Sequence, residues 1–269
     1  MKTNEKVSRE HLLYLRKIKR RSIKINVFRG AIFVLFLGLW EFSYRTGLTD
    51  GFIFSAPSRI AVSLYTLALS GDLLKHSAIT LYETLLGFLI ASAGGTLIAL
   101  LLWLNETVRK IAEPYVVVLN SLPKIALGPL IIIWFGSGRT AIVVMAVLIT
   151  VIVTVITMLA GFVSTDENKL LLMKTFGANK LQILLKLVLP ANVPTFISML
   201  KINIGLSWIG SIMGEYLVSE AGIGYLIVYG GQVFRLDLVY ASTLALCVLA
   251  TGMYALVCLA ERKIRNRQK

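Results

Sequence analysis

Three long uncharged segments constrain the fold of this chain more than any other feature. They run from 84 to 105, from 140 to 165 and from 238 to 260, and each is long enough to cross a bilayer as a helix. Charged residues make up 16% of the 269 residues, whereas soluble domains carry about 25%. We therefore predict an all-α, polytopic membrane protein. The net charge of +14 is then interpreted by its position along the chain and not as a sign of nucleic-acid binding.

The hydropathy pattern predicts six transmembrane helices. The third is expected to be broken by Pro114, Pro123 and Pro129, and to follow a tight polar connection, Asn105–Lys110. Short helices are expected outside the spans at Arg59–Leu69 and Gly224–Phe234. The six spans are expected at about 27–44, 77–104, 111–135, 141–163, 193–217 and 238–260.

Lysine and arginine are distributed unevenly between the two sides that six spans define. Of the 28 such residues, 21 lie in 1–29, in Asn105–Lys110, in the loop after the fourth span and in 262–269, against five on the other side. The positive-inside rule then predicts that both termini and this loop are cytoplasmic. We expect a basic amphipathic segment (1–26), a six-span domain (27–262) and a basic tail (263–269).

The sizeable polar segment in the middle of the chain is Thr165–Pro190, here called the central loop. Its apolar residues recur at helical spacing, with lysines between them. Gly177 can end one short helix because glycine accepts the left-handed conformation, and Asn179 can cap a second helix. Pro190 is expected to close the segment. The pattern predicts two short amphipathic helices joined at Gly177.

The spacing within the central loop resembles that of permease subunits of binding-protein-dependent ABC importers. In that family a glycine is followed, after nine residues, by Ile-x-Leu-Pro, as Gly177 is followed here by Leu187–Pro190. This chain departs from the pattern at 171–173, where Leu-Leu-Met replaces the usual Glu-Ala-Ala. Residues 121–130, 133–136 and 222–226 are similar to the branch that serves nitrate, taurine and aliphatic sulfonates. The resemblance covers about residues 54–262.

The resemblance implies a type I importer permease in the cell membrane of a prokaryote. A second permease subunit, most simply an identical one, would form the pore with it, and two cytosolic subunits would bind ATP. An extracellular solute-binding protein would deliver the solute. We expect the permease itself to hold no cofactor or metal. The residues expected to couple it to the ATP-binding subunits are Asp166, Leu172, Met173, Phe176, Gly177, Ala178, Leu189 and Pro190.

Ionisable residues inside the predicted spans are costly and are candidates for a functional role. Lys124 and Lys201 both fall about 15 Å from the cytoplasmic face, where two cations could line a path for an anion. The favoured explanation is structural: each amine snorkels to the interface or donates to backbone groups freed by Pro123 and Pro129. Glu83 and Glu215 fall in the outer third of their spans, where structural pairing or a hydrated outer vestibule is favoured over gating. Glu215 is also a candidate for the solute path, together with Lys124 and Lys201.

Three other functions were weighed. An intramembrane enzyme is disfavoured because the two histidines and all the aspartates lie outside the spans. ATP hydrolysis by this chain is excluded because the sequence has no phosphate-binding GxxxxGK[ST] loop. A secondary transporter or channel stays open as a lower alternative. Among importers, a small anion is the favoured solute, and a thiamine-pyrimidine or another heterocyclic precursor is the alternative.

The predicted orientation can be tested with intact cells. A protease added outside should leave the N-terminal 24 residues, the central loop and the tail uncut, because all three are expected to be cytoplasmic. A tag on Lys269 that an external antibody reaches would contradict the six-span arrangement.

Overall fold

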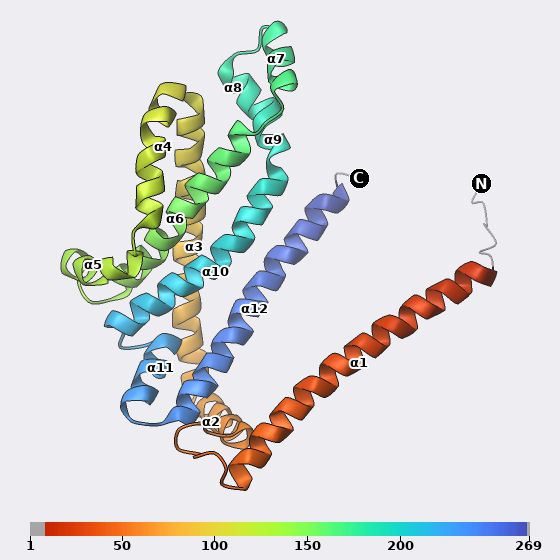
Figure 1. Ribbon diagram of the computed structural model, residues 1–269. Coiled ribbons are helices and arrows are strands. Elements are labelled where there is room, and N and C mark those ends of the chain that lie inside the picture. Colours follow the sequence, from red (N-terminus) through yellow and green to blue (C-terminus); the bar gives the residue numbers. More distant parts are fainter. Residues whose placement is uncertain (1–8, 268–269) are drawn as a thin grey trace. The chain divides into compact units, whose positions relative to one another are not determined.

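The computed structural model describes residues 9–267, and the regular elements in this range are all helical (Figure 1). The chain divides into two units, 1–62 and 63–269. In the first unit, α1 (Arg9–Arg45) runs without a break through the expected boundary between the basic segment and the first span. At its end Arg45 Nε lies 2.9 Å from Glu41 Oε1, and Ser58 N–H donates to Glu41 Oε2. Residues 1–8 and 268–269 of the expected basic ends lie outside the described residues.

The second unit begins within α2 (Pro57–Leu69) and contains the rest of the helices. In chain order these are α3 (Asp72–Leu104), α4 (Glu106–Ser121), η1 (Lys124–Leu127), α5 (Gly128–Phe135), α6 (Arg139–Val163), α7 (Glu167–Thr175), α8 (Lys180–Ile183), η2 (Leu184–Val188, a π-turn), α9 (Leu189–Ala191), α10 (Val193–Val218), α11 (Ile223–Gln232) and α12 (Leu236–Arg267).

Five described helices are long and apolar enough to cross a membrane, and a sixth span results if α4 and the η1–α5 segment count as one. These correspond in order to the six predicted spans. The α4 and η1–α5 pieces meet at 85°. The bend lies at Leu122–Pro123, whereas Pro114 sits inside α4 without ending it. Pro129 lies in the first turn of α5, where its missing N–H costs nothing, so it does not break this helix either.

The connection before α4 is also shorter than predicted. Asn105 alone has extended backbone between α3 and α4, and its side chain accepts hydrogen bonds from the N–H groups of Thr107 and Val108. Residues 106–110 therefore belong to the start of α4 and not to a polar loop, because one asparagine accepts from two of the free N–H groups of the new helix.

Helix α6 packs mainly against α3 and α10, and these three helices form the centre of the second unit. Glycines allow the close approach. A Cβ atom added to Gly210 of α10 would lie 2.5 Å from the Cα atom of Ala146 on α6, and one added to Gly95 of α3 would lie 2.6 Å from Thr154 Cβ. Backbones this close gain dispersion contacts that larger residues would prevent.

Buried polar groups join the same three helices. The Asn203 side-chain amide on α10 donates to Ser92 Oγ on α3 and to Thr154 Oγ1 on α6, both at 2.9 Å. One turn along, the hydroxyls of Ser207 and Thr150 lie 3.3 Å apart. All five side chains are buried, so these polar groups find within the protein the hydrogen-bond partners that lipid cannot provide.

Two glycines of α10 provide a matched test of this packing. Gly205→Ala adds its methyl group to open space and should leave stability unchanged or raise it by up to about 1 kcal/mol, because alanine is the better helix former. Gly210→Ala forces α10 away from Ala146 and should destabilise the fold by about 1–3 kcal/mol. Thermal unfolding in detergent compares the two. Equal melting temperatures would contradict the close contact between α6 and α10.

Candidate functional site

The central loop forms the two short helices that the sequence predicts. The Asp166 carboxylate caps α7 by accepting from Asn168 N–H at 2.9 Å. Gly177 ends this helix with φ of +77°. Its N–H donates to the Lys174 carbonyl and the next N–H, that of Ala178, donates to Met173, which is the Schellman arrangement. Asn179 and Gln182 then cap α8 reciprocally.

The second half of the central loop packs into the centre of the second unit, the bundle formed by α3, α6 and α10. Ile183, Leu184 and Val188 are buried in a cluster with residues of α3, α6 and α10. Met173, Ala178 and Leu189 pack against the same cluster. Because these contacts bury one set of the loop's apolar side chains in the core, we expect the loop to move with the bundle.

The end of the loop differs from the prediction. Pro190 lies in the first turn of α9, directly after the π-turn, and helical structure continues through Ala191. The break before α10 is at Asn192, whose side chain donates to Thr165 Oγ1 at 3.1 Å and to the Val188 carbonyl at 2.9 Å. One buried amide thus connects the first residue of the loop to its last turn.

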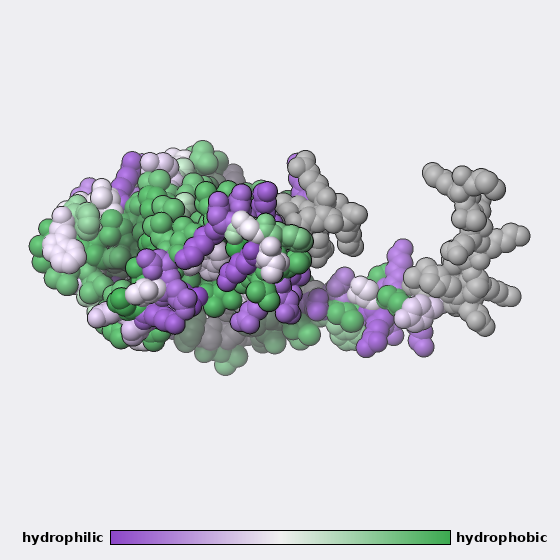
Figure 2. All heavy atoms as spheres, turned by 90° about the horizontal axis from the view of Figure 1, so that it is seen from above, coloured by the Kyte–Doolittle hydropathy of each residue, from purple (hydrophilic) through white to green (hydrophobic). Residues whose placement is uncertain are grey.

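A second set of loop side chains projects outward. Leu172 is 54% exposed and Phe176 is 77% exposed, although both are large apolar residues. Leu171, Leu181 and Leu185 are exposed as well. In the view from the central-loop end, hydrophilic residues gather over the bundle among hydrophobic ones (Figure 2). An exposed apolar surface with a polar surround is typical of a protein contact.

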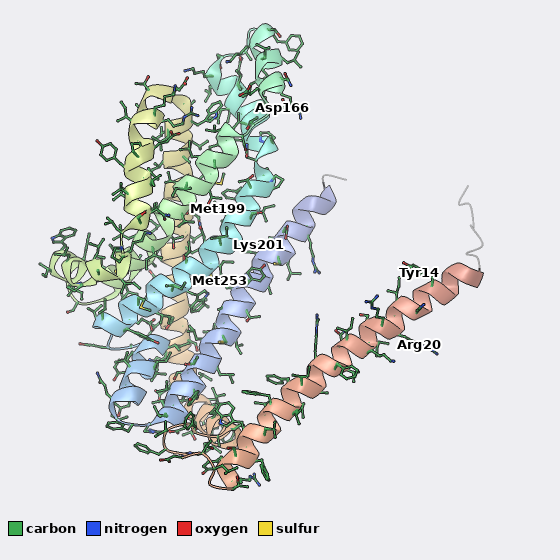
Figure 3. All side chains as sticks on the ribbon, viewed as in Figure 1. Tyr14, Arg20, Asp166, Met199, Lys201 and Met253 are labelled. Atoms are coloured by element: carbon green, nitrogen blue, oxygen red, sulfur yellow. The ribbon has the colours of Figure 1, made fainter. Side chains whose placement is uncertain are left out.

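The two lysines of the expected solute path have different surroundings. Lys201 on α10 lies beside α12 (Figure 3), and its Nζ atom is 2.6 Å from Glu261 Oε2, so its charge is paired. Lys124 lies at the bend between α4 and α5, and its Nζ atom donates to the Asn120 carbonyl at 3.1 Å. Among the ion pairs of the described residues, none includes Lys124.

Glu215 lies at the opposite end of the bundle, beneath the start of α11, and is 1% exposed. Three successive N–H groups at this helix start are bound by side chains of α3 and α10. Gly222 N–H donates to His76 Nδ1 at 2.8 Å, Ile223 N–H to Thr80 Oγ1 at 2.7 Å, and Gly224 N–H to Glu215 Oε2. Sequence reasoning missed His76 and Thr80, because their partners lie more than 140 residues away.

Glu83 of α3 lies one turn after Thr80 and is also 1% exposed. Its Oε1 atom lies 3.8 Å from Arg139 Nε at the start of α6. Glu83 and Arg139 line a cavity of about 270 Å³ together with residues 137–138 and 218–221. In the described residues no cluster of three metal-ligating side chains occurs, here or elsewhere.

Residues 84–266 match the model of the family described as "Binding-protein-dependent transport system inner membrane component". The formylaminopyrimidine transport permease protein ThiX of Halalkalibacterium halodurans is 32% identical, over 72% of this chain and 76% of that protein. The taurine transport system permease protein TauC of Escherichia coli is 25% identical, over 88% of this chain and 89% of that protein.

The solved methionine ABC transporter MetNI, in an inward facing conformation, has a chain of similar fold. The TM-score is 0.65, with 17% identity, over 73% of this chain and 98% of that one. At this identity the likeness concerns the fold alone.

Proposed function

The chain belongs to the family of inner membrane components of binding-protein-dependent transport systems, and we propose that it couples ATP hydrolysis by separate subunits to import of a small anionic solute. Members of this family are the non-catalytic permease subunits of ABC importers. The coupling role is supported chiefly by the two faces of the central loop. One face exposes apolar side chains, and the other is buried in the bundle.

The proposed contact with the ATP-binding subunit involves the protruding side chains of α7. Leu172 and Phe176 would enter a groove on that subunit, in the helix-in-groove mode of recognition. Met173 and Ala178 would have another role, because they hold the loop to its own bundle. Asp166 and Gly177 set the two ends of α7, while Leu189 and Pro190 continue the chain toward α10. A closing motor would then tilt the bundle through the loop as a lever.

The proposed assembly follows the type I importer plan. Two copies of this chain would surround the solute path, with two ATP-binding subunits on the cytoplasmic side and a solute-binding protein outside. The orientation rests on the excess of lysine and arginine in the N-terminal segment, the central loop and the tail. The central loop would then face the cytosol, where the ATP-binding subunits reach it.

An aliphatic sulfonate, taurine or nitrate is the proposed class of solute. Lys124 supports this choice, because an ammonium group without a paired carboxylate attracts an anion in a low-dielectric path. Lys201 contributes less, since Glu261 neutralises it in this conformation. Glu215 would act on the path only if α11 moved away from it. The similarity to ThiX keeps a pyrimidine solute as the alternative.

The coupling proposal predicts different outcomes for two substitutions of Gly177. Gly177→Val forces a β-branched residue to φ of +77° and should disrupt assembly with the ATP-binding subunits or abolish solute-stimulated ATPase activity. Gly177→Asn should retain most activity, because asparagine tolerates this conformation. Co-purification and ATPase assays on the reconstituted complex provide the measurement. Normal coupling in the valine variant would contradict the proposed role of the loop.

The substrate proposal predicts that Lys124→Gln lowers anion uptake at least tenfold while basal ATPase activity is retained, because the cation on the path is lost. The control is the pair Lys201→Met and Glu261→Gln, made together so that no partner is left with an unpaired charge. This double variant should transport nearly normally. Unchanged uptake by Lys124→Gln would remove the physical argument for an anion. A solute-binding protein that prefers a neutral heterocycle would favour the alternative.

A further inference from the structure

Glu83 and Glu215 are both buried at the α11 end of the bundle, and each side chain is 1% exposed. Thr80, which lies one turn before Glu83 on α3, and Glu215 bind successive N–H groups at the start of α11, so both carboxyl groups lie close to this helix start. Two ionised carboxylates buried together are costly, because burial disfavours the charged form and like charges repel. A proton on one of them removes much of this cost.

The donors around the pair show which carboxyl group is ionised. Glu215 accepts from the backbone N–H group of Gly224, at the start of a ten-residue helix whose dipole favours a negative charge. Within residues 9–267, Glu83 has no comparable donor. Arg139 Nε, on a side chain that is 68% exposed, lies 3.8 Å from Glu83 Oε1, beyond hydrogen-bonding distance.

One oxygen atom of each carboxyl group lacks a hydrogen-bond donor among the described residues. Glu83 Oε2 and Glu215 Oε1 are buried, and neither receives a hydrogen bond from an N–H or O–H donor in the part of the chain that the structure describes. An ionised oxygen without a donor in such a place is costly. A proton shared between the two side chains removes this cost at both oxygens.

We propose that Glu83 and Glu215 form a binding site for a single proton, with protonated Glu83 as the donor and the Glu215 carboxylate as the acceptor. The bound proton connects α3 to α10 at the point where Glu215 holds the start of α11. It leaves one negative charge, which faces the helix start and Arg139. Loss of the proton places two negative charges side by side and loosens the attachment of α11.

The site has consequences for pH dependence. The other titratable groups around it are His76 on α3, Arg139 on α6, Tyr216 on α10, Tyr225 on α11 and Glu220 in the connection before α11. In the neutral range the folded protein holds one proton on this pair, while the unfolded chain holds none on either carboxyl group. Stability should therefore fall as the pH rises through this range, because the folded state binds more protons.

The experiment uses the full chain in lipid nanodiscs. Infrared spectra at neutral pH should show the carbonyl band of a protonated carboxylic acid, and carbon-13-labelled glutamate should shift this band. Glu83→Gln should abolish the band, because the amide can donate to Glu215 without a bound proton. The matched control is Glu220→Gln, which removes an exposed carboxylate from the wall of the same cavity and should leave the band unchanged.

Thermal unfolding provides a second readout. Between about pH 5 and pH 8, the melting temperature of the unsubstituted chain should fall with rising pH more steeply than that of Glu83→Gln. The proposal is overturned if the unsubstituted chain has no label-sensitive acid band, or if the band survives in both Glu83→Gln and Glu215→Gln. It is equally overturned if the band is absent and added Na⁺ raises the melting temperature, since a cation would then replace the proton. The spectra of the labelled, unsubstituted chain decide the question even if a variant fails to fold.

Discussion

The close approach of α6 to α3 and α10 is the contact on which the rest of the second unit depends. Helices in lipid gain little from burying apolar side chains, since the lipid tails are equally apolar. Their association relies on tight packing and on hydrogen bonds that lipid cannot replace. Gly95 and Gly210 provide the first, and Asn203 provides the second by bonding to both neighbouring helices.

This bundle carries a different polar structure at each end. At one end the central loop inserts Ile183, Leu184 and Val188 into the core, and Asn192 connects its two ends. At the other end His76, Thr80 and Glu215 hold the start of α11. A displacement applied to the loop would therefore be transmitted through α6 and α10, both of which are fixed to it and to each other. A motor acting on one side of a membrane requires such a connection.

Much of this arrangement could be predicted from the sequence. The spans were recognisable because a bilayer demands long apolar helices, and the central loop because Gly177 accepts a positive φ that few other residues tolerate. Prolines were weaker guides. Pro129 lies in the first turn of α5, where its missing N–H needs no partner. Pro114 lies inside α4, where its missing N–H removes a hydrogen bond without ending the helix, and the bend occurs at Pro123.

Contacts between distant residues account for what the sequence did not predict. Lys201 and Glu261 are 60 residues apart, and no local pattern indicated that they pair. Two of the three side chains that cap α11, His76 and Thr80, come from α3, more than 140 residues earlier in the chain. The sequence also did not predict that Leu172 is exposed while the neighbouring Met173 is partly buried, because both residues fit an amphipathic helix. The packing of α7 on the bundle determines which of the two is covered.

If the central loop transmits motion as proposed, the loop and the bundle should move as one body when ATP binds. Spin labels at Lys169→Cys on α7 and Leu89→Cys on α3, both exposed positions, measure this once Cys247 and Cys258 are replaced by alanine. In the reconstituted complex, the distance between the two labels within one chain should stay the same with and without ATP, while distances between the two permease chains change. A change of the distance within one chain, with no change between chains, would contradict the account.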